Sequence, residues 1–192
     1  MQSTGAVWRS RRRRGAPNFN AEMTARGLEA RQELLRVDTI TAAPEIAAQL
    51  GLDEDAEVIV RRLMFTVEGE PVQRTDGYYP SSMFAATPVS EALRVRGGVA
   101  AYIEDQMGRR ISQFVERLSM RMPVPEEIAM LKLGPGVPVV HVQRLARDTE
   151  GVPVEFLDSV VVGDRYIFEY VIDVDSFEDG AVPTELRPRN TI

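Results

Sequence analysis

Apolar and polar residues alternate along most of the chain after residue 32, a period-two pattern that predicts strands with one buried face. In residues 110–121, for example, Phe114, Glu116, Leu118 and Met120 fall on one face. Turns rich in glycine and proline separate these segments. We therefore expect six or seven strands, at residues 33–41, 57–67, 72–79, 110–121, 136–147, 152–162 and 164–173.

Short helical patterns fall at the connections between these strands. Each follows a proline or a glycine pair and ends near a glycine, as helix starts and exits do. We expect helices at residues 44–50, 99–107 and 125–133. Because successive strands are joined by short turns, such as the one at residues 68–71, the sheet should be antiparallel. The sequence thus predicts an α+β fold, an antiparallel sheet of six to seven strands with short helices on one side.

The two ends of the chain lack this patterning. Residues 1–27 hold glycine, proline and arginine without a sustained period, and we interpret them as a mobile arm or linker. The arginine run at residues 9–14 fits a solvated tail, with phosphate contact as the alternative. The folded domain is expected over residues 28–175 and a C-terminal tail over residues 176–192.

Composition narrows the function classes. The 192 residues contain no cysteine and one histidine, which excludes disulfides, thiolate metal sites and a multi-histidine zinc site. The net charge of the chain is −6. Because the arm holds several of the arginines, the folded part is more acidic than this total, which argues against nucleic-acid binding by the folded part. There is no transmembrane or signal-peptide pattern, so we expect a cytoplasmic protein.

No catalytic centre is visible in the sequence. His141 lies in an apolar strand with no nucleophile motif, and we interpret it as structural rather than catalytic. The acidic pairs, such as Glu126-Glu127, fit solvated turns and first helical turns. Gly97-Gly98 could offer backbone N–H groups to an anion, or could be a plain helix junction. Residue patterns alone indicate an α+β domain in which a ligand pocket could form.

Several motifs that follow one another in a fixed order point to a more specific fold and function. Residues 58–73 followed by Tyr78-Tyr79-Pro80, then the segment from Arg144 to Glu155, then residues 163–166, resemble the UTRA domain. UTRA domains are the effector-binding halves of transcription regulators in the HutC branch of the GntR family. The resemblance implies a chorismate lyase-like fold, a small-molecule pocket, a homodimer and an N-terminal winged helix-turn-helix that binds DNA. Residues 3–9 resemble the end of a winged-helix wing, so we expect the chain to begin where that DNA-binding domain ends.

The resemblance also implies a set of pocket residues. Of the positions with which phosphosugar-sensing members bind their ligand, Glu155 alone matches, so the ligand is expected to be more apolar than a phosphosugar. It would place a polar or cationic group at Glu155 and an acidic group at Arg61. Leu63 and Phe65 could instead be core, and Arg144 is expected to pair with a carboxylate. The expected ligand-binding residues are Arg61, Leu63, Phe65, Thr75, Tyr79, Gly98, Glu155 and Val161.

The sequence therefore predicts the effector-sensing, dimerising domain of a GntR/HutC-type transcription regulator. It would not be an enzyme, would need no cofactor or metal, and would reach DNA only through the missing winged-helix domain. The alternative is a chorismate lyase-like enzyme acting on an aromatic acid, which would not need the wing remnant. A third possibility is a protein-interaction module without a ligand.

Overall fold

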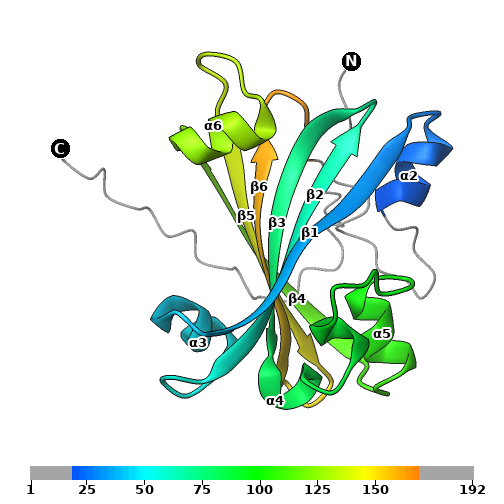
Figure 1. The fold of residues 1–192 in the computed structure, drawn as a ribbon, viewed down its shortest axis with the longest axis vertical. Helices are drawn as coiled ribbons and strands as arrows, with labels where there is room; N and C mark the ends of the chain where they lie inside the picture. Colours follow the sequence, from blue (N-terminus) through cyan, green and yellow to red (C-terminus); the bar gives the residue numbers. More distant parts are fainter. Residues whose placement is uncertain (1–18, 169–192) are drawn as a thin grey trace, which may run out of the picture.

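The computed structural model describes residues 19–168, and its centre is one antiparallel sheet of six strands (Figure 1). The strand order is β1-β2-β3-β6-β5-β4, so β1 and β4 form the edges. This confirms the predicted α+β class. The strands are β1 (Ala30–Thr41), β2 (Glu57–Val67), β3 (Glu70–Pro80), β4 (Ile111–Arg121), β5 (Val139–Asp148) and β6 (Pro153–Val162).

Six short helical segments accompany the sheet, and none of those described is long and apolar enough to cross a membrane. The three predicted helices are confirmed as α3 (Pro44–Leu50), α5 (Val99–Asp105) and α6 (Pro125–Leu131). Proline opens α3 and Gly51 closes it with a left-handed backbone at φ 63°, as the sequence pattern indicated. The sequence patterns did not predict α2 (Phe19–Ala25) or the 3-10 helix η1 (Pro88–Ser90). They indicated one helical turn between Pro80 and Pro88, where α4 (Ser81–Phe84) forms.

Three expectations need correction. The arm predicted over residues 1–27 is wrong for its last part, because α2 forms there and buries Phe19 and Met23, one helical turn apart. The strand predicted over residues 164–173 is absent from residues 164–168, where Tyr166 makes a single bridge; residues 169–173 lie outside the described part. The helices cover both faces of the sheet rather than one, because both faces carry apolar side chains (Figure 1).

Strand alternation divides the sheet residues between these two faces. On the first, which we call the α2/α5 face, lie Ile59, Arg61, Leu63 and Phe65 of β2 and their cross-strand partners. The opposite α3/α6 face packs Val58 and Phe156 against α3 at one end, and Val160 and Val162 against α6 at the other. The sheet is thus a two-sided wall with separate apolar clusters at its two ends.

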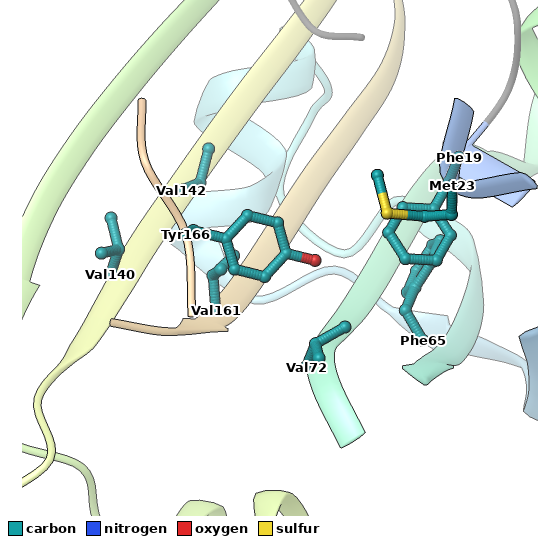
Figure 2. Close-up of a cluster of buried hydrophobic side chains, with 8 residues drawn as sticks. All are labelled: Phe19, Met23, Phe65, Val72, Val140, Val142, Val161 and Tyr166. Carbon is teal, nitrogen blue, oxygen red and sulfur yellow. The ribbon is translucent and has the colours of Figure 1, made fainter. Parts of the chain in front are cut away.

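The α2/α5 face also carries two apolar clusters. The α2 cluster joins Phe19 and Met23 to Phe65, with the Phe19 and Phe65 rings edge-on at 5.1 Å, and continues to Val161 and Tyr166 (Figure 2). The α5 cluster packs the sheet against the segment from α4 to α5. Its buried members are Ile59, Tyr79, Phe84, Val89, Val95, Ile103, Ala146 and Val154. The region between these two clusters is where the candidate site lies.

Phe84→Ala tests the covering of the sheet by the segment from α4 to α5. Phe84 is fully buried and meets the Tyr79 ring edge-on at 5.5 Å, so its loss should leave a cavity and lower the free energy of unfolding by about 3–5 kcal/mol. Leu93→Ala is the matched control, because Leu93 is 61% exposed and should change stability by less than about 0.5 kcal/mol. Urea denaturation of both variants measures the difference. Equal losses in the two would contradict this packing.

Candidate functional site

Two rows of side chains cross the α2/α5 face between its apolar clusters. Cross-strand register defines them, because partners on neighbouring antiparallel strands point to the same face. We call them the central rows. The first consists of Leu63, Thr75, Ser159 and Val142, and the second of Arg61, Gly77, Leu157 and Arg144. Val142 at the end of the first row also belongs to the α2 cluster. Small and polar residues are therefore concentrated in the middle of a face that is apolar at both ends.

Arg61 is the most firmly held of the predicted site residues. It is only 3% exposed. Its Nη1 donates to the carbonyl oxygens of Val89 at 2.6 Å and Glu91 at 2.9 Å, and its Nη2 donates to that of Leu93 at 2.6 Å. Burial lowers the pKa of the Arg61 guanidinium below its usual value. Its side chain therefore ties β2 to the backbone that leads from η1 towards α5.

A second buried group joins Tyr79, Glu155 and Arg144. The Tyr79 hydroxyl donates to Oε2 of Glu155 at 3.2 Å, and Nη2 of Arg144 donates to Oε1 of the same carboxylate at 3.4 Å. The Arg144 guanidinium also lies over the Phe114 ring, 4.9 Å from its centroid. Burial, reinforced by the Glu155 charge, raises the pKa of Tyr79 well above its usual value, so this phenol stays protonated and remains a donor.

Gly77 makes this arrangement possible. A Cβ atom at residue 77 would lie 2.7 Å from the Tyr79 hydroxyl and 3.1 Å from Cδ2 of Leu157. Real Cβ atoms do not approach other atoms so closely, so any side chain here would displace the phenol. The Tyr79 hydroxyl thus reaches Glu155 because residue 77 has no side chain.

A short chain of hydrogen bonds joins Gln73 to two hydroxyl groups of the first central row. Nε2 of Gln73 donates to Oγ1 of Thr75 at 2.7 Å, and the Thr75 and Ser159 hydroxyls are 2.9 Å apart. All three residues are buried. Neither apolar cluster of this face includes Thr75, Gly77 or Ser159. These polar atoms could recognise the hydroxyl, carbonyl or amide group of a small ligand.

The structure brings together some of the eight predicted residues but not all. Arg61, Leu63 and Thr75 lie in the central rows, with Tyr79 and Glu155 directly beside them. Phe65 and Val161 belong to the α2 cluster, where they pack as core (Figure 2). Gly98 precedes α5 with a left-handed φ of 89°, and an added Cβ would meet no heavy atom within 4 Å. A ligand role for any of these residues stays a prediction.

Sequence reasoning missed Gln73, Ser159 and Phe114 at this site. The only signal for them is their position in the two-residue period, and its use requires the order and register of all the strands. The expectation that Arg144 pairs with a carboxylate is confirmed, since its partner is Glu155. His141 lies on the opposite face, with its Nε2 2.5 Å from Oδ1 of Asp158. Within residues 19–168, no cluster of three or more acidic, histidine or cysteine residues could hold a metal ion.

Known proteins resemble this chain in sequence. A family model described as the UTRA domain matches residues 25–167. An HTH-type transcriptional regulator of Streptomyces coelicolor is 29% identical over 157 residues, which cover 79% of this chain and 58% of the relative. The HTH-type transcriptional repressor PhnF of Mycolicibacterium smegmatis is 24% identical over 82% of this chain and 64% of the repressor. The chain therefore spans less than two thirds of the length of these relatives.

The fold resembles a solved structure as well. The crystal structure of the effector domain of PhnF from Mycobacterium smegmatis superposes with a TM-score of 0.72 and 24% sequence identity. The similar region covers 82% of this chain and 95% of that domain. The sheet with its helical covers is therefore the fold of that effector domain.

Gly77→Ala tests the close approach of Tyr79. The added methyl group should displace the phenol and lower the free energy of unfolding by about 1–3 kcal/mol, as overpacking of a core does. The additional change Tyr79→Phe removes the nearest clashing atom and should restore part of that loss. Gly134→Ala is the control, because its added Cβ would lie 3.9 Å from the nearest atom, on Val137. Thermal and urea unfolding measure these changes; if Gly77→Ala were as stable as Gly134→Ala, the arrangement would be wrong.

Proposed function

Because the UTRA model matches residues 25–167, the chain belongs to the UTRA domain family, and we propose that it is the effector-sensing domain of a GntR/HutC-type transcription regulator. The family match is the observation that carries this proposal. It is supported by relatives described as HTH-type regulators and by the fold of the PhnF effector domain. In the whole protein, a winged helix-turn-helix preceding this domain would bind DNA in the cytoplasm.

We propose that the effector is a small molecule that binds over the central rows. These rows offer hydroxyl groups at Thr75 and Ser159 and a buried guanidinium at Arg144. Leu63 and Leu157 of the same rows are partly buried and add apolar surface. The predicted pocket is retained in this form, with Phe65 and Val161 as its apolar boundary rather than its polar contacts.

Arg61 provides a route from this site to the helical cover. A ligand that displaced the Tyr79 ring or competed for the Arg61 guanidinium would alter the three bonds that hold residues 89–93. That change would move the segment between η1 and α5 relative to the sheet. An effector with different affinities for the two arrangements would shift their populations and so couple to the spacing of DNA-binding domains in a homodimer.

The chorismate lyase-like alternative has less support. The relatives are described as transcriptional regulators. In the candidate site both carboxylate oxygens of Glu155 already accept a hydrogen bond, one from Tyr79 and one from Arg144, so this group serves as the partner of those side chains. We propose that the chain is not an enzyme. We also extend the expected domain N-terminally to include α2, while the arm before it and the tail at residues 176–192 stay predictions outside the described residues.

A compound screen by thermal shift tests effector binding. A ligand at a hundred times its dissociation constant stabilises the folded domain by about 2.7 kcal/mol, which a melting curve resolves. Thr75→Val removes the hydroxyl that joins Gln73 to Ser159 and should weaken binding about tenfold. Thr66→Val makes the same chemical change outside the central rows and should leave binding unchanged. Equal effects of both substitutions would place the effector elsewhere.

The assembly is a separate prediction. The edge strand β4 leaves Leu118 and Met120 exposed, and Met122 and Val124 continue this apolar surface towards α6. We expect a homodimer, with twice the 21.4 kDa mass of one chain. Light scattering at tens of micromolar protein measures it. A mass of one chain over the whole concentration range would contradict the dimer.

A further inference from the structure

The buried charges on the α2/α5 face do not balance. Arg61, Arg144 and Glu155 are its buried charged residues, at 3%, 8% and 3% exposure. Asp148, also buried, forms its own ion pair with Arg109 at the end of β5. Within residues 19–168, this face therefore carries two buried guanidinium groups and one buried carboxylate besides that ion pair, an excess of one positive charge. A buried charge is costly unless an opposite charge accompanies it.

The excess positive charge belongs to Arg61, which has no carboxylate beside it as a counter-ion among the described residues. Its three hydrogen-bond acceptors are backbone carbonyl oxygens, which carry partial charge only. No carboxylate within residues 19–168 forms an ion pair with it. Arg61 and Arg144 both act electrostatically on the Tyr79 phenol, as Glu155 does, so the four groups belong to one cluster.

Arg144 contributes a donor that is left unused. Its Nε is buried and has no hydrogen-bond partner, and its one ion-pair contact with Glu155 is long at 3.4 Å. Its neighbour across the strands, Glu116 of β4, is partly exposed, and no ion pair joins the two in the described part of the chain. A buried N–H without a partner on a charged group is uncommon in native structures and calls for an explanation.

We infer that the effector carries one carboxylate group, which binds at Arg144 and neutralises the excess charge of the Arg61–Tyr79–Glu155–Arg144 cluster. This inference rests on the proposed function and specifies the chemistry of its ligand. A carboxylate matches the planar fork of a guanidinium. The rest of the ligand is largely apolar, since Leu63 and Leu157 lie in the same rows and the Phe114 ring lies beside Arg144.

The same charges disfavour the other ligand classes. A phosphate monoester carries about −1.5 to −2 at neutral pH, more than the single excess positive charge can neutralise. A cationic ligand would add to the excess. The cationic group that the sequence led us to expect at Glu155 is therefore unnecessary, because that carboxylate already has Tyr79 and Arg144 as partners.

Matched small probes test the inference by isothermal titration calorimetry on the full chain. The carboxylates are benzoate, phenylacetate and hexanoate, and each is compared with its neutral amide. Phenyl phosphate and 2-phenylethylamine represent the dianionic and cationic classes. We expect at least one carboxylate to bind about tenfold to a hundredfold more tightly than its amide, the range of a charge-assisted hydrogen bond.

Three variants locate the contact. Arg144→Gln should reduce carboxylate affinity at least tenfold. Arg144→Gln with Glu155→Gln should do the same without leaving the Glu155 carboxylate buried without its arginine partner. Glu155→Gln alone should keep or increase the affinity, because it removes the competing negative charge. The control is Arg147→Gln on the same strand, where the arginine donates to the exposed turn carbonyl of Gly151; it should change nothing. Circular dichroism confirms folding of each variant.

The outcomes separate this inference from the proposed function. The inference is wrong if amides bind as tightly as carboxylates, if Glu155→Gln weakens carboxylate binding, or if Arg147→Gln acts like Arg144→Gln. If phenyl phosphate, the amine or an amide alone binds and Thr75→Val weakens it, the effector site stands and the carboxylate inference fails. If no probe and no screened compound of any class binds at millimolar concentration, both fail.

Discussion

The burial of two guanidinium groups on one sheet face is the constraint on which the rest of this structure depends. The buried Arg61 guanidinium needs acceptors away from water. Its acceptors are the carbonyls of Val89 in η1 and of Glu91 and Leu93 after it, and these bonds hold the helical cover over the sheet. Arg144 must find a carboxylate, and Glu155 supplies it with the help of Tyr79. That approach in turn requires a glycine at residue 77. One polar requirement thus determines the cover, the buried pair and the backbone beneath them.

Much of the fold could be predicted from the sequence because local patterns determine it. The bounds of β2 and α3 follow from alternation and from a Pro44 start with a Gly51 exit. The helix α2 escaped prediction because it is short and follows a segment rich in arginine and glycine, and its stability comes from packing Phe19 on Phe65, a long-range contact. At the site, resemblance to the family indicated Glu155, and strand alternation from the family's positions indicated Tyr79. Ser159 became visible only when the strand register placed it beside Thr75.

The arrangement suits a sensor better than a catalyst. Charged groups in the site are paired or bound to backbone, and the buried Nε of Arg144 is the donor that the proposed carboxylate contact would use. The apolar clusters on either side hold the sheet rigid, while the cover near α5 is attached through Arg61 to the site itself. In the proposed effector-sensing role, this attachment would link a small change at the ligand site to a movement of the cover, which a regulator could transmit across the proposed dimer.

The central claim is that a small molecule binds over the central rows of the α2/α5 face. Two-dimensional NMR of the isotope-labelled chain, titrated with the tightest compound from the screen, tests this most directly. The account predicts that amide shift changes concentrate at Arg61, Gly77, Arg144 and Ser159 and extend to the segment after η1 that Arg61 holds. Changes centred on His141 and Asp158 of the opposite face would contradict it.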